Sequence, residues 1–115
     1  MSGAARAFAC LAFATIVSCG TAPRYEWGGY ESMLRRAWLE PGAMDPADAT
    51  ARLQEQVEAT LAAQRLVPPG VRAHLAWMHA DAGNRAECER WLRAEAEAYP
   101  ESRAFVDGMI ARLRK

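Results

Sequence analysis

The stretch PGVRAHLAWMHADAGNRAECERWLRAEAEAYP, residues 69–100, decides the fold because it contains two helical patterns with clear stop and start signals between them. In its first part, apolar residues from Val71 to Met78 recur at the spacing of one helix face, and Asp81-Ala82-Gly83 ends the pattern. In its second part, Asn84 opens a variant of the capping box and Pro100 ends the helix. The stretch therefore predicts two consecutive helices.

Three further helices flank this pair. Asp45-Pro46-Ala47-Asp48 supplies a capping aspartate and a proline at the first helical position, so a helix starts there and runs to the break at Val67-Pro68-Pro69-Gly70. Its apolar stripe has four-residue steps at Ala49, Leu53, Val57 and Leu61. Before it, the apolar face from Tyr30 to Trp38 predicts a short helix that stops at Glu40-Pro41-Gly42. After the pair, a last apolar stripe has four-residue steps at Phe105, Met109 and Leu113, and Val106 and Ile110 widen this face.

The expected fold is therefore all-α, with about five short helices in an antiparallel array. No segment alternates apolar and polar residues for long enough to predict a strand. The charged residues of the fourth helix intermix at spacings that allow pairing, which is typical of a solvated face. They are Glu87, Glu89, Arg90, Arg93, Glu95 and Glu97.

Length and charge limit the classes of function. At 115 residues the chain is long enough for one compact domain and too short for two. Fourteen basic residues balance fourteen acidic ones, so the chain lacks the surplus of positive charge that binding to a phosphate backbone requires. We therefore expect no nucleic-acid partner.

The N-terminus carries a targeting signal. Arg6 precedes an apolar stretch, and the stretch ends in Ile16-Val17-Ser18-Cys19, which resembles the lipobox of bacterial lipoproteins. That resemblance implies a lipid chain on the Cys19 sulfur and cleavage just before this residue. An aspartate directly after the cysteine would favour retention in the inner membrane. This chain has Gly20 at that position, so it resembles the lipoproteins that are sorted to the outer membrane. An ordinary cleaved signal or an uncleaved buried helix is the alternative interpretation.

The domain plan follows from this signal. Residues 1–18 form the signal peptide, residues 19–28 the lipidated cysteine and a tether, and residues 29–115 the helical domain. The tether assignment depends on the glycine, threonine and proline after Cys19, which show no apolar period. Cys88 then remains as a lone cysteine within a helical pattern, where we expect a small buried hydrophobic residue.

Residues typical of catalysis or metal binding are scarce. His74 and His79 are five positions apart, which places them on different sides of one helix, whereas a metal pair at a spacing of four would share a face. The few serines lie outside any nucleophile motif, and no glycine-rich phosphate loop occurs. We expect no metal, no cofactor and no catalytic residue.

Aromatic residues are the candidate binding residues. Tyr25, Trp27 and Tyr30 lie between the tether and the first helix, and Trp77 lies in the third helix. They pack into the core if the segment folds back over the array. If some of them stay exposed, they are anchors for a partner protein, because tryptophan and tyrosine dominate interface hot spots.

The two central helices resemble a tetratricopeptide unit, in which large and small residues alternate so that two helices nest antiparallel. The resemblance is partial, since several positions depart from the pattern. Its residues are Leu75, Ala76, His79, Gly83, Cys88, Leu92 and Pro100.

A second resemblance covers nearly the whole chain after the signal. The blocks Tyr25-Glu26-Trp27-Gly28-Gly29-Tyr30, Pro68-Pro69-Gly70, Ala82-Gly83 and Tyr99-Pro100-Glu101-Ser102 resemble the bacterial lipoprotein family of domain of unknown function 4810. The resemblance implies a small lipoprotein encoded beside a curli-secretion-channel-like lipoprotein, with no catalytic residues carried over.

We therefore expect a non-catalytic adaptor or assembly factor, anchored in the outer membrane through a lipid on Cys19 and facing the periplasm. Its partner is another envelope protein, with the curli-secretion-channel-like lipoprotein implied by the family resemblance. A periplasmic enzyme or metal-binding lipoprotein is the alternative. A cleft with convergent polar groups favours the alternative, and an apolar groove lined by Trp and Tyr favours the adaptor.

Overall fold

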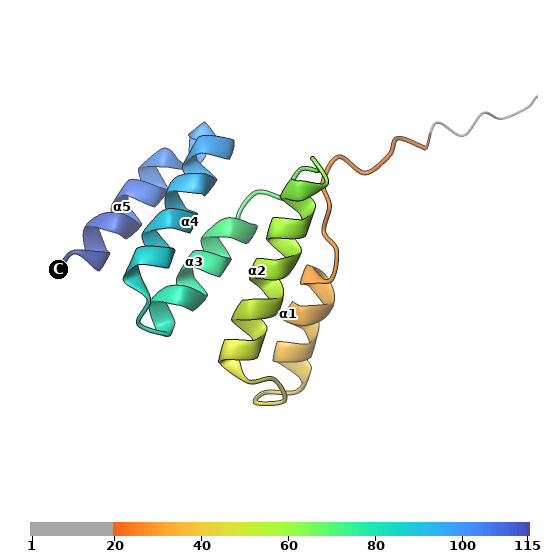
Figure 1. Cartoon of the computed structure of the whole chain (residues 1–115), viewed down its shortest axis with the longest axis horizontal. Coiled ribbons are helices and arrows are strands. Elements are labelled where there is room, and N and C mark those ends of the chain that lie inside the picture. The colour runs from red at the N-terminus through yellow and green to blue at the C-terminus, as the bar shows by residue number, and fades with distance from the viewer. Residues whose placement is uncertain (1–19) are drawn as a thin grey trace, which may run out of the picture.

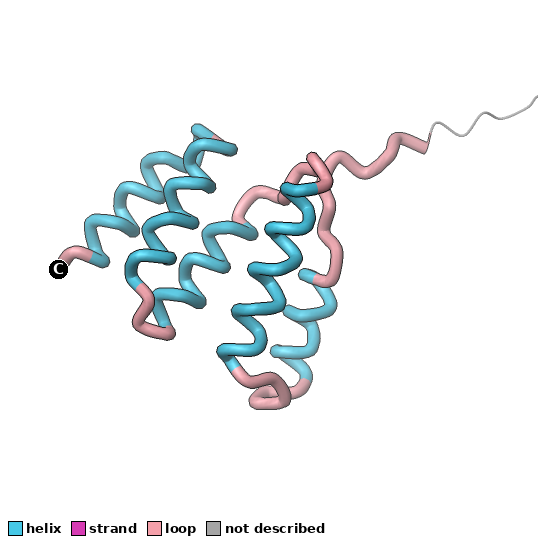
Figure 2. The backbone as a smooth tube through the Cα atoms, viewed as in Figure 1, coloured by secondary structure: helices cyan, strands magenta, loops and turns pink. Residues whose placement is uncertain are grey.

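The computed structural model describes residues 20–115, and within this range it is helical with no strand (Figure 2). The prediction of an all-α fold is confirmed. Residues 1–18, expected as signal peptide, and Cys19 lie outside the described residues. The elements are α1 (Tyr30–Leu39), α2 (Pro46–Ala62), α3 (Val71–Asp81), α4 (Arg85–Ala98), the short 3-10 turn η1 (Pro100–Ser102) and α5 (Arg103–Leu113).

Local signals set the helix boundaries where the sequence predicts them. The Asp45 carboxylate accepts hydrogen bonds from the backbone N–H groups of Ala47 at 2.9 Å and Asp48 at 3.3 Å, which satisfies two free donors at the start of α2. Asn84 caps α4 in the same way through the N–H of Glu87. Gly83 ends α3 with a positive φ of 82°, a conformation that glycine adopts without steric cost.

The helices follow one another in a single row and alternate in direction, from α1 at one side to α5 at the other (Figure 1). α3 packs against α2 and most extensively against α4, and α4 packs against α5. The N-terminal segment leaves the array near the loop between α2 and α3, and the C-terminus lies at the far side of the row (Figure 1).

The hydrophobic core runs through four of the five helices. Cys88 is fully buried in it, as predicted for a small hydrophobic residue. No residue of α1 is fully buried, and this helix contacts the edge of the core through the partly buried Tyr30 and Met33. The core residues are Leu53, Val57, Val67, Val71, Leu75, Ala76, Cys88, Trp91, Leu92, Val106 and Ile110.

In two helices part of the buried face differs from the predicted one. On α5 Val106 and Ile110 are buried, as members of the predicted face, whereas Phe105, predicted on the inward stripe, is 56% exposed. On α2, Thr50 and Thr60 are buried. Each hydroxyl donates to the carbonyl oxygen four residues earlier at 2.8 Å, so the buried polar group keeps a hydrogen-bond partner.

The predicted solvated face of α4 also needs a correction at Glu95. This side chain is 2% exposed, and its Oε1 atom accepts a hydrogen bond from the backbone N–H of Gly70 at 2.5 Å. Gly70 is the residue before α3, so the buried carboxylate joins α4 to the start of α3. Four other charged residues of this face form two exposed ion pairs, Arg90–Glu87 and Arg93–Glu89.

Candidate binding groove

The N-terminal end of α1 is held by polar contacts. The Tyr30 hydroxyl and Nδ1 of His74 on α3 form a hydrogen bond of 2.9 Å. Gln56 on α2 adds two bonds, because its Oε1 accepts from the Gly29 N–H at 3.1 Å and its Nε2 donates to the Trp27 carbonyl at 2.7 Å. These bonds position the first turn of α1 against both neighbouring helices.

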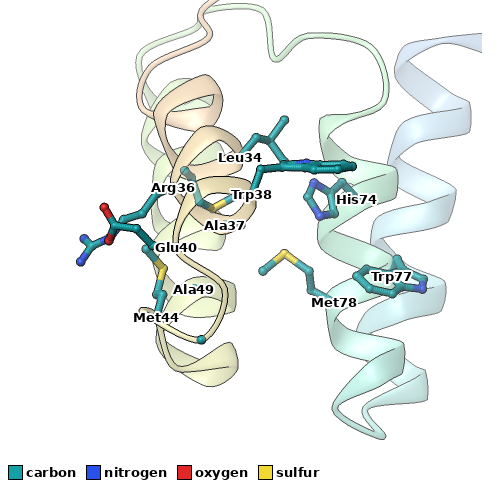
Figure 3. Close-up of a pocket in the computed structure, with 12 residues that line it drawn as sticks. Leu34, Arg36, Ala37, Trp38, Glu40, Met44, Ala49, His74, Trp77 and Met78 are labelled. Atoms are coloured by element: carbon teal, nitrogen blue, oxygen red, sulfur yellow. The ribbon is translucent and has the colours of Figure 1, made fainter.

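An open groove separates the C-terminal half of α1 from α3. The groove has a volume of about 480 Å³. Trp38 and Leu34 extend from α1 toward α3 above His74, and Met78 lies between the two helices (Figure 3). The full lining is Met33, Leu34, Arg36, Ala37, Trp38, Glu40, Gly42, Met44, Ala49, His74, Trp77 and Met78.

The groove exposes large apolar side chains to solvent. Trp38 is 83% exposed, although the sequence places it on the inward face of its helix. Trp77, on α3, is 54% exposed. The prediction that α1 buries this face is wrong for its C-terminal half, because no other element of residues 20–115 covers Trp38 and the groove takes the place of a core contact.

The groove is close to neutral. Its two charged lining residues are Arg36 in the last turn of α1 and Glu40 just after the helix, and they approach to 3.6 Å. Burial lowers the pKa of His74 below its ordinary value, so this side chain is uncharged at neutral pH. Burial also raises the pKa of Tyr30, which keeps the phenol protonated. The lining therefore fits an apolar occupant better than a charged one.

Of the four aromatic residues predicted as partner-binding residues, one lines the groove and three lie outside its lining. Trp77 lines the groove. Tyr30 is half-buried at the end of the groove and stacks against Trp27, with ring centroids 6.2 Å apart. Tyr25 is half-buried and lies outside the groove lining.

Sequence reasoning missed Trp38 and three methionines as groove residues. Met33, Met44 and Met78 come from α1, the α1–α2 turn and α3, so only the tertiary structure brings them together. The available signal is the two-residue run Trp38-Leu39 at the end of a short helix, where both side chains are strongly exposed.

No group of three or more His, Cys, Asp or Glu side chains that could hold a metal ion occurs in residues 20–115. His79 lies half-buried, and its Nε2 bonds to Oε1 of Gln54 at 2.9 Å. None of the helices described is both long and apolar enough to span a bilayer.

Comparison with protein families places these features in a known group. The model of the family described as Domain of unknown function (DUF4810) matches residues 24–109, which include the groove and all five helices except the end of α5. No curated protein and no solved structure matches the chain. Because the family model covers most of the sequence, the chain belongs to the DUF4810 family.

Proposed function

We propose that this protein is a non-catalytic adaptor of the bacterial envelope that binds another envelope protein in the groove between α1 and α3. The observation that carries the proposal is the exposure of Trp38 and Trp77 on the rim of a neutral apolar groove. We also propose that a lipid on Cys19 anchors the chain in the outer membrane on its periplasmic side, as the Ile16-Val17-Ser18-Cys19 motif predicts.

The chemistry of the groove favours an apolar protein segment as its occupant. Tryptophan provides a large rigid contact area and is enriched among the residues that dominate interface energies. The three methionines of the lining are flexible and polarisable, so they adapt to the shape of a partner. A groove between two helices also suits the apolar face of a third helix, a common mode of peptide recognition.

The identity of the partner rests on the family resemblance. Members of the family look like small lipoproteins encoded beside a curli-secretion-channel-like lipoprotein, so we propose that the curli-secretion-channel-like lipoprotein is the partner. A tetratricopeptide-like packing of the helices agrees with that role, because curved helical arrays present extended concave binding surfaces.

Binding of the lipidated protein to the purified curli-secretion-channel-like lipoprotein tests the proposal. A Trp38→Ala change should weaken binding by about 30-fold, since removal of a hot-spot tryptophan costs about 2 kcal/mol or more. Trp38 is 83% exposed, so the variant should keep the stability of the unaltered chain.

Phe105→Ala is the matched control. Phe105 is another exposed aromatic residue, at 56%, and it lies on α5 outside the groove. Binding by this variant should equal that of the unaltered protein. Equal affinity of the Trp38 and Phe105 variants would show that the groove does not bind this partner.

A further inference from the structure

The segment before α1 is packed against one end of the array. The N–H of Glu26 donates to the Leu66 carbonyl at 2.9 Å, and the Glu26 carboxylate pairs with Arg65 at 3.1 Å. Residues 25–28, which the sequence assigns to the tether, therefore lie on the C-terminal end of α2 and the loop that follows it. We call this region, residues 24–28 and 61–66, the tether end.

The tether end exposes apolar side chains beside positive charge. Leu61, Leu66 and Trp27 are 41%, 51% and 40% exposed. Arg24 and Arg65 are the basic residues of these segments, against a single glutamate, Glu26. Exposed leucine and tryptophan next to arginine is the composition of surfaces that lie in the headgroup region of a bilayer, where tryptophan rings are enriched.

The length of the connecting segment restricts how the domain can sit on a membrane. Six peptide steps separate Cys19 from Tyr25, a reach of at most about 22 Å. α2 has 17 residues and is about 25 Å long, and its far end carries the turn that closes the groove. The segment is therefore shorter than α2, which favours an orientation with the tether end near the bilayer over one with the α1–α2 turn on it.

We propose that the tether end rests on the phospholipid surface and that the groove opens away from it, an inference that depends on the lipid anchor proposed above. Anchoring makes the contact intramolecular, so a small apolar patch is enough to orient the domain. In this orientation α2 rises from the membrane, and Trp38 faces a partner that approaches from the aqueous side.

Two exposed leucines at opposite ends of the α1–α2 pair provide a matched test. The full lipidated chain is incorporated into vesicles of phosphatidylethanolamine and phosphatidylglycerol, with an environment-sensitive fluorophore on Leu66→Cys or on Leu39→Cys. Leu39 is 68% exposed at the end of α1, next to the groove. Cys88 is fully buried and is protected from the label. Circular dichroism checks that each labelled variant is folded.

Quenching by a spin-labelled lipid headgroup should be several-fold stronger at position 66 than at position 39. Equal quenching, or stronger quenching at position 39, overturns the proposed orientation. Weak quenching at both sites overturns it as well and leaves the tether end free for a protein partner.

Vesicle flotation and the mass of the N-terminal peptide separate this inference from the anchor itself. A chain that floats with a lipidated Cys19 but shows no preference between the two labels contradicts only the orientation. A chain with an unmodified Cys19 contradicts the proposed anchor, and the orientation falls with it.

Discussion

The phase of α5 provides a sharp test of the core, because Phe105 and Ile110 lie on the same helix with opposite exposure. Ile110 is 6% exposed and Phe105 is 56% exposed. Ile110→Ala removes three buried carbon groups, which costs about 2.4 kcal/mol at about 0.8 kcal/mol each, and the cavity raises this to about 3 kcal/mol. For a domain of this size, the melting temperature should fall by about 10–20 °C.

Phe105→Ala should cost less than about 1 kcal/mol, since more than half of this side chain already contacts solvent. Thermal unfolding followed by circular dichroism compares the two variants directly. The larger side chain has the smaller expected effect, so hydrophobicity alone predicts the opposite order. If Phe105→Ala destabilises as much as Ile110→Ala, α5 packs through the Phe105, Met109 and Leu113 side of its apolar face, and its placement with Phe105 exposed is wrong.

Three further predictions concern other parts of the chain. Cys19→Ala should release the protein from the membrane fraction or leave an uncleaved precursor, and a mature membrane-bound product would contradict lipidation. Gly28→Ala should lower the free energy of unfolding by about 1–2 kcal/mol, because φ is +50° and the added carbon would lie 2.6 Å from Nε2 of Gln56. Gly108 lies in a helix with nothing within 4 Å of an added carbon, so Gly108→Ala should raise the free energy of unfolding by about 0.5–1 kcal/mol. A urea titration measures both changes. Because burial lowers the pKa of His74 below the ordinary value of 6.5, the unfolded chain binds more protons near that pH than the folded chain does. Stability should therefore decrease as the pH falls through 6.5, and His74→Gln should lose that part of the pH dependence.

The sequence predicts the helix boundaries well because the signals are local. Asp45 with Pro46, Asn84, and the glycine and proline breaks each act on backbone groups within a few residues. Such contacts form in the same way whatever the rest of the chain does. The starts of α2 and α4 therefore fall where the capping residues place them.

Burial within each helix is less predictable, since it depends on which neighbour covers which face. Glu95 belongs by sequence to a charged, solvated helix surface, yet it lies under the start of α3 and accepts the N–H of Gly70. Leu61 belongs by sequence to the apolar stripe of α2, yet it is 41% exposed at the end of that helix. No local sequence pattern distinguishes an apolar helix face that a neighbouring helix covers from one that stays exposed to solvent.

The binding groove depends on the same kind of information. The sequence predicts Trp77 as a partner-binding residue, but its apolar periodicity places Trp38 on the inward face of a helix. Such a periodicity gives the same signal for a helix that packs in the core and for one that leaves a groove beside it. The difference is visible only in the position of α1 relative to α3 (Figure 3).

The one-sided attachment of α1 has a consequence for binding. Polar bonds from Tyr30 and Gln56 hold its first turn, while no residue of the helix is buried in the core. A helix with so few buried apolar contacts opens locally at low free energy. An occupant that covers Trp38 and Met78 adds the apolar contacts that folding alone leaves unmade, so binding stabilises α1 by mass action. Binding in the groove and the stability of α1 are therefore linked. When the occupant binds, the protection of backbone amides from hydrogen exchange should increase more in α1 than in α5.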